Sequence, residues 1–308
     1  MVSNEPTPTL RKKRRGVAVL PTLFTLGNCL CGFASLHYAA RGANTTMTHS
    51  DSVMMWPYIS DYSIAGYLIL AAMFFDMFDG FVARLTHSAS KFGAELDSLA
   101  DMVSFGVAPA FLALNQISSM LAGSYGLKYW EIVGPNADSQ LGSLFWIIGA
   151  VYVACAAMRL ARFNTMTQLE TSHHMSFRGL PSPGAAGVVV ASIIFFEALH
   201  ATRPVLGRSI APELNAWSKL VFPYMMPLIL LIAALLMVSR FSYAHLINRF
   251  LRGRKRFRNV VWVFLLVMVL LWQPQITALV LIYLYALSAP VVAVWRTIFP
   301  KAVVVKNG

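Results

Sequence analysis

The stretch SIAGYLILAAMFFDMFDGFVARL, residues 63–85, determines the fold class of this chain. It is long enough to cross a bilayer as an α-helix, which takes about 20 predominantly apolar residues. Similar stretches recur along the sequence, at about 17–40, 101–122, 141–163, 179–201, 219–241, 258–273 and 276–295. Hydrophobic residues make up 57% of the chain and charged residues only 12%. We therefore predict an all-α fold, a polytopic membrane bundle of about eight transmembrane helices.

Basic residues divide the chain into three parts and give the bundle an orientation. Residues 1–16 form a basic tail, residues 17–241 a six-span core, and residues 242–308 a basic loop followed by a two-span hairpin. With a cytoplasmic amino terminus, 20 of the 25 Lys and Arg residues fall on the cytoplasmic side, in agreement with the positive-inside rule. The sequence thus predicts a multi-pass protein of the cell membrane whose two termini both lie in the cytoplasm.

The net charge of +12 raises the question of an anionic partner. No aromatic-interleaved basic domain or known nucleic-acid module accompanies this charge, which argues against nucleic acid as the partner. The densest basic cluster, at 249–258, follows the sixth predicted span, where it would rest on the negative inner leaflet of a membrane. We expect anionic membrane lipids as partners, although a role in topology alone explains this cluster equally well.

The segment at 76–101, DMFDGFVARLTHSASKFGAELDSLAD, is unusually charged for a link between two apolar spans. At about 100° per residue, one face of the first helix collects charged and small residues: Asp76, Asp79, Gly80, Ala83 and Arg84. The second helix carries another polar face, with Asp97, Asp101 and Ser104. Two such faces can oppose each other within the bundle.

The four aspartates of this segment need counter-charges, because an unpaired acid at membrane depth is costly. One arginine, Arg84, does not balance four carboxylates. An all-oxygen donor set suits hard cations such as Mg²⁺, Mn²⁺ or Ca²⁺ better than zinc or copper. Helix-end charges are the simpler explanation, but they do not require two opposing acidic faces. We therefore predict a site for divalent metal.

The aspartates follow a fixed spacing, Asp76-x2-Asp79-Gly80-x2-Ala83-Arg84-x8-Gly93-x3-Asp97-x3-Asp101, which resembles without departure the signature of the CDP-alcohol phosphotransferase family. The resemblance implies an integral-membrane enzyme that transfers a phosphatidyl or similar group from a CDP-linked donor to an alcohol and releases CMP. It also implies that the six-span core is the catalytic part and that the protein forms a homodimer.

The resemblance assigns a role to each letter of this motif. Asp76, Asp79 and Asp97 would bind the divalent metals, and Asp101 would also stand near the metals and act as the catalytic base. The metal would neutralise charge on the departing CMP, and a carboxylate would accept the proton of the attacking hydroxyl. The remaining fixed residues of the motif would line the CDP-binding site: Gly80, Ala83, Arg84 and Gly93.

Four further segments resemble the phosphatidylserine synthase branch of this family: LPTLFTLGNCLCGFAS (20–35), KFGAELDSLADMVSFGVAPA (91–110), RLARFN (159–164) and FRGLPSPGAAG (177–187). This resemblance implies CDP-diacylglycerol as the donor and L-serine as the acceptor. Arginines on the cytoplasmic side would clamp the serine carboxylate, and a glutamate would pair with its ammonium group. The acceptor-binding candidates are Glu95, Ser104, Arg159, Arg162 and Arg178.

Three alternatives stay open at this point. The acceptor could be glycerol 3-phosphate or inositol phosphate, which would require an additional basic pocket for the acceptor phosphate. The arginines could serve only as topology anchors. The acids could instead form the ion path of a cation transporter. A transporter predicts acids spread across the depth of the membrane, whereas these four cluster near one face.

Overall fold

The computed structural model describes residues 19–44, 60–85, 91–125, 132–137, 139–169, 179–200, 212–241, 243 and 273–298. Its elements are, in chain order, α1 (Val19–Asn44), α2 (Asp61–Leu85), α3 (Lys91–Asp101), η2 (Met102–Val107), α4 (Ala108–Tyr125), α6 (Gln140–Leu169), α7 (Ser182–His200), α8 (Pro212–Val238) and α11 (Pro274–Ile298). Within these residues there is no strand, which confirms the predicted all-α fold.

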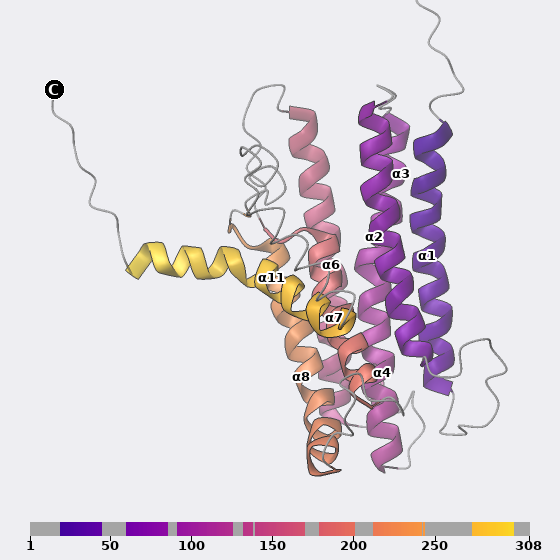
Figure 1. Ribbon diagram of the computed structural model, residues 1–308, viewed down its shortest axis with the longest axis vertical. Helices are drawn as coiled ribbons and strands as arrows, with labels where there is room; N and C mark the ends of the chain where they lie inside the picture. Colours follow the sequence, from indigo (N-terminus) through magenta and orange to yellow (C-terminus); the bar gives the residue numbers. More distant parts are fainter. Residues whose placement is uncertain are drawn as a thin grey trace, which may run out of the picture.

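Long helices run side by side along one axis and form the body of the molecule (Figure 1). α3, η2 and α4 follow one another without a break and form a single rod that runs the length of the bundle. α1 packs along α2, and α6 packs against both η2 and α8. α7 lies among the others and contacts α2, α4, α8 and α11. The acidic segment of the sequence therefore lies where α2 ends and the long rod begins.

Six of the described helical segments are long and apolar enough to cross a membrane: Asp61–Val82, Phe92–Ala122, Gln140–Thr165, Ser182–His200, Trp217–Val238 and Pro274–Trp295. They confirm the predicted polytopic helical bundle. α1 (Val19–Asn44) is not among these six segments. It nevertheless lies beside α2 (Figure 1). The predicted span at 258–273 lies outside the described residues, and the orientation of the termini stays a prediction.

Small residues let the central helices approach closely, as is common between membrane helices. A Cβ atom added at Gly66 of α2 would lie 2.9 Å from the side chain of Ile194 in α7. Gly32 of α1 is equally close to η2, because a Cβ atom there would lie 2.8 Å from the Cα atom of Ser104. These contacts fix α1 and α2 against the helices behind them.

The short element η2 is a π-helix of 6 residues that directly follows Asp101. Its backbone is tied to α6, since the Tyr152 hydroxyl donates a hydrogen bond to the backbone oxygen of Phe105 (3.1 Å). Both side chains are fully buried. Single π-helical turns inside α-helices often occur at functional sites, so the residues just before η2 are candidates for a functional site.

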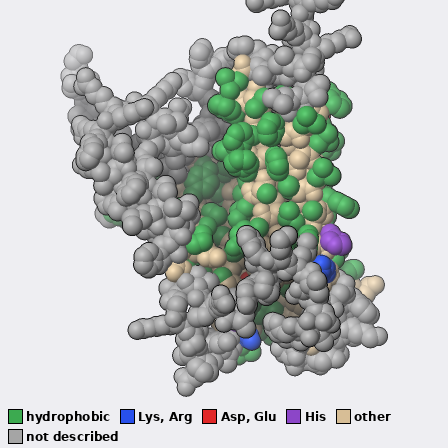
Figure 2. All heavy atoms as spheres, turned by 45° about the vertical axis from the view of Figure 1, so that its right-hand side comes forward, with side chains coloured by type: hydrophobic (Ala, Val, Ile, Leu, Met, Phe, Trp, Pro, Cys, Tyr) green, Lys and Arg blue, Asp and Glu red, His purple; other side chains and the backbone are tan. Residues whose placement is uncertain are grey.

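The outer surface of the bundle is hydrophobic. Figure 2 shows one face covered by hydrophobic side chains over most of its length, with histidine and basic side chains near its lower end. Leu30 and Phe33 of α1 are 66% and 67% exposed. Large apolar side chains at this density match a surface that faces lipid.

The last described helix, α11, takes a course that hydropathy does not predict. Its bounds agree with the predicted span at 276–295, but Figure 1 shows α11 crossing the bundle and extending past its side. It contacts α7, and its hydrophobic window is only 17% buried. Hydropathy specifies the length of an apolar helix and not the direction in which it packs. The division into a six-span core and a two-span hairpin therefore stays a prediction.

Candidate active site

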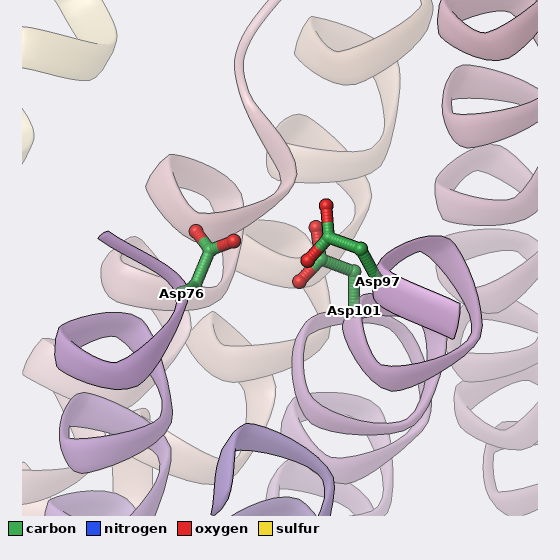
Figure 3. Close-up of side chains that lie close together, drawn as sticks. All are labelled: Asp76, Asp97 and Asp101. Carbon is green, nitrogen blue, oxygen red and sulfur yellow. The ribbon is translucent and has the colours of Figure 1, made fainter. Parts of the chain in front are cut away.

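Three carboxylates from two helices converge at one point of the bundle. Asp76 comes from α2, and Asp97 and Asp101 lie one helical turn apart on α3. One oxygen atom from each of the three lies within 4.8 Å of the other two. Figure 3 shows Asp76 facing Asp97 and Asp101 across the gap between these helices. The structure thus brings together the two acidic faces that were inferred from the sequence.

This acidic cluster, defined as Asp76, Asp97 and Asp101, has the features of a cation site. Asp101 is buried, and the other two carboxylates are half-buried. The Oδ1 atom of Asp97 is buried and has no hydrogen-bond partner. Carboxylates crowded together in a low-dielectric region repel one another unless a cation or proton intervenes. Three converging carboxylates, one of them with an unpartnered buried oxygen, therefore fit a hard divalent ion such as Mg²⁺, Mn²⁺ or Ca²⁺.

Asp79, the fourth predicted metal ligand, lies beside the acidic cluster and outside it. Its side chain is 6% exposed, and its Oδ2 atom is buried without a hydrogen-bond partner. It lies near Asp76 and Asp97 and near Thr25 of α1. Three of the four predicted ligands thus form the cluster, and Asp79 is close enough to Asp97 to complete the predicted set.

The residues predicted to line the CDP site occupy the turns next to the acidic cluster. Among the described residues, a Cβ atom added at Gly80 would meet no other atom within 4 Å, so these residues leave space open beside it. Gly93 is half-buried near the start of α3. The side chains of Ala83 and Arg84 lie outside the described part of the structure. The free volume beside Gly80 would let a bulky ligand reach the backbone next to the carboxylates.

The acceptor-binding candidates fall at different distances from the acidic cluster. Arg159 of α6 is close enough to Asp76 and Asp101 to interact with both electrostatically, and its guanidinium donates a hydrogen bond to Ser182 at the start of α7. Arg162 follows one turn later and is half-buried, whereas Glu95 is exposed. Arg159 is thus the candidate that the structure brings nearest to the carboxylates.

The two other acceptor-binding candidates have less structural support. Ser104 is fully buried, and its hydroxyl donates a hydrogen bond to the backbone oxygen of Asn28 in α1 (2.9 Å). It therefore faces α1 and not the open side of the site. Arg178 lies outside the described residues.

One polar contact of the acidic cluster was not foreseen from the sequence. The Asn28 amide of α1 donates a hydrogen bond to the Oδ1 atom of Asp101 (3.0 Å). Asn28 is fully buried. The available signal was a pair of polar residues, Thr25 and Asn28, three positions apart in an apolar helix, but nothing in the sequence says which helix they face.

The comparison with known families covers this whole site. The family model for CDP-alcohol phosphatidyltransferase matches residues 18–225, which is more than half of the chain and includes all four aspartates. This chain belongs to that family. The match extends from α1 into α8 and leaves α11 outside.

Several curated relatives carry one name, CDP-diacylglycerol–serine O-phosphatidyltransferase. The Helicobacter pylori protein is 34% identical over 182 residues, which are 59% of this chain and 60% of that protein. The Bacillus subtilis protein is 31% identical over 171 residues, 56% of this chain and 73% of its own. The Saccharomyces cerevisiae protein is 40% identical over 131 residues, 41% of this chain and 40% of its own. The chain thus matches 60% of the length of the Helicobacter pylori relative.

Proposed function

We propose that this protein transfers the phosphatidyl group of CDP-diacylglycerol to the hydroxyl of L-serine, giving phosphatidylserine and CMP. The observation that carries the proposal is the acidic cluster, because it gathers three of the four aspartates of the motif from two helices around one point. The names of the relatives supply the donor and the acceptor. The serine-branch segments of the sequence support the same acceptor.

Asp76, Asp97 and Asp101, with Asp79 beside them, would hold one or more divalent cations, either Mg²⁺, Mn²⁺ or Ca²⁺. When bound, the cation supplies positive charge that offsets the charge developing on the departing CMP. The unpartnered buried oxygens of Asp79 and Asp97 support this assignment. Gly80, Ala83, Arg84 and Gly93 would line the CDP site next to these carboxylates.

Asp101 would handle the proton of the reaction as the catalytic base. The serine hydroxyl oxygen forms a bond to the phosphorus that carries diacylglycerol, and Asp101 accepts the hydroxyl proton. The bond between this phosphorus and the bridging oxygen of the pyrophosphate breaks, and CMP leaves with the electron pair of that bond. Burial of Asp101 would keep bulk water from competing with serine.

The acceptor would bind at the cytoplasmic end of α3 and α6. Arg159 is the best-placed group for the serine carboxylate, because it already lies near Asp76 and Asp101. Glu95, Arg162 and Arg178 are further candidates, and the buried Ser104 is the least suited. In the cell, we infer that the protein is a homodimer of the cell membrane, with its site facing the cytoplasm and anionic lipids against its basic loop.

The test is release of CMP from CDP-diacylglycerol by the purified full-length protein in detergent. We expect turnover with L-serine and a divalent cation, and none without acceptor or with excess EDTA. Glycerol 3-phosphate and inositol phosphate are offered in parallel, because each would reveal a different acceptor. Equal or faster turnover with either phosphate would overturn the serine assignment. Absence of CMP release with every acceptor would overturn the proposed reaction itself.

A further inference from the structure

A buried polar stripe runs along the face of α1 that contacts the acidic site and the long rod. Thr25, Asn28 and Ser35 are at most 4% exposed, and Gly32 lies between the last two. Spacings of three and four residues place all of them on one face of the helix. Burying polar side chains at membrane depth costs free energy unless they make specific contacts. The contacts of this stripe therefore indicate why polar residues occur here.

Asn28 makes the contact that reaches the acidic cluster. We propose that Asn28 is a positioning residue, which fixes the orientation of the Asp101 carboxylate and thereby sets both the affinity for divalent metal and the rate of turnover. Its amide donates to Asp101 Oδ1 at 3.0 Å, with both side chains buried. The proposal rests on the function proposed above insofar as Asp101 is taken to be a metal ligand and the base.

The place of Asn28 is itself fixed by neighbours in η2. The Ser104 hydroxyl donates to the backbone oxygen of Asn28 at 2.9 Å. Gly32, one turn further along α1, leaves no room for a side chain against the Cα atom of Ser104. The helix that carries Asn28 therefore holds a fixed distance to the helix that carries Asp101. A hydrogen-bond donor held in this way can select one orientation of the Asp101 carboxylate.

Selecting one rotation has a chemical consequence for Asp101. When Asn28 occupies Oδ1, the other oxygen is left for a cation or for the proton of the acceptor. Partners of this kind orient ligands at metal sites, and their loss typically costs about 10–100-fold in metal affinity or activity. The amide contributes no charge and accepts no proton, so Asn28 would act through Asp101 alone.

A packing role alone explains Asn28 less well. The Oδ1 atom of its own amide is buried and has no hydrogen-bond partner. An unsatisfied buried acceptor destabilises the folded protein, and a leucine of similar volume would avoid that cost. Within the described part of the chain, the side-chain hydrogen bond of Asn28 goes to Asp101, so the donor group, and not the volume, accounts for an asparagine here.

The first measurement needs no substrate. Binding of Mn²⁺ to the purified full-length protein is followed by electron paramagnetic resonance for the wild type, Asn28→Leu and Ser35→Ala. We expect Asn28→Leu to weaken Mn²⁺ binding by about 10-fold or more. Ser35 is the matched control, because it lies on the same buried stripe and its hydroxyl has no hydrogen-bond partner among the described residues. Its variant should bind Mn²⁺ like the wild type.

The second measurement separates positioning from packing by a double-mutant cycle. Asn28→Leu is introduced into the wild type and into Asp101→Asn, and Mn²⁺ affinity and CMP release are measured for all four proteins. If Asn28 acts through Asp101, its loss should cost about 10–100-fold in the wild type but less than about threefold once Asp101 is already changed. Equal losses in both backgrounds would show a packing role and overturn the proposal.

Folding and function are controlled separately in this design. The melting temperature of each variant is recorded, and Asn28→Ala is measured in the same way if Asn28→Leu does not yield folded protein. Unchanged Mn²⁺ binding in a folded Asn28 variant would also overturn the proposal. The Mn²⁺ measurements keep their meaning even if the acceptor screen shows that serine is not the substrate, so the two failures are distinguishable.

Discussion

At the scale of single residues, Asp97 and Asp101 lie one turn apart on α3 but have different surroundings. Asp97 Oδ1 is buried without a partner, whereas Asp101 Oδ1 accepts a hydrogen bond from Asn28. The first environment suits a residue whose main partner is a cation. The second suits a carboxylate that must keep one orientation while a proton is transferred to it.

This difference leads to a prediction for two matched variants. Asp97→Asn should weaken binding of both metal and CDP-diacylglycerol, since the cation links the protein to the donor pyrophosphate. Asp101→Asn should retain much of the donor affinity at saturating metal and lower kcat by about 10²–10⁴-fold, as expected for a lost base. Donor binding and turnover are measured side by side. If both variants lose donor binding equally, Asp101 is mainly a metal ligand, and Glu95 becomes the next candidate for the base.

At the scale of helices, α1 approaches η2 closely beside the acidic cluster. A Cβ atom at Gly32 would press on the backbone of Ser104, which is not free to move like the end of a flexible side chain. Gly187 of α7 offers a matched comparison, because a Cβ atom there would lie 3.4 Å from its nearest neighbour, Ile282, in ordinary contact.

We therefore predict opposite effects for two Gly→Ala substitutions inside helices. Gly187→Ala should leave stability unchanged or raise it by up to about 1 kcal/mol, because alanine is the better helix former. Gly32→Ala should lower it by about 1–3 kcal/mol, because overpacking outweighs that gain. Thermal unfolding in one detergent measures both. A Gly32→Ala protein as stable as the wild type would show that α1 can move away from η2 without loss.

The helices also show which parts of the structure could be predicted from the sequence. The fixed spacing of the aspartates, together with helical periodicity, was enough to place Asp76 opposite Asp97 and Asp101. The partner of Asp101 was not predictable, because Asn28 lies 73 positions away and the contact depends on how two helices are rotated. The π-helix after Asp101 has no hydropathy signature, and the direction of α11 is set by packing on α7.

At the scale of the whole molecule, the orientation in the membrane is testable with two exposed positions. Ala94 lies near the start of α3, and Ser139 directly precedes α6, at the opposite end of the bundle. In a variant without native cysteines, we expect a membrane-impermeant thiol reagent to label Ser139→Cys in intact cells. It should label Ala94→Cys only after permeabilisation, because the positive-inside rule places that end in the cytoplasm. The reverse pattern would place the acidic cluster on the outer side.

The part of α2 around Asp76 also has a lipid-facing side, which bears on how CDP-diacylglycerol would reach the site. Phe74 and Met77, the neighbours of Asp76, are 55% and 58% exposed, so the carboxylate is separated from the lipid-facing surface by the width of one helix. Under the proposed function, a lipid substrate would reach the site by lateral diffusion and never leave the bilayer, while serine and CMP exchange with water. Saturation of the site by CDP-diacylglycerol would then depend on the mole fraction of this lipid in the membrane. Enlarging the membrane would dilute the donor even when its amount per volume of cell stays constant.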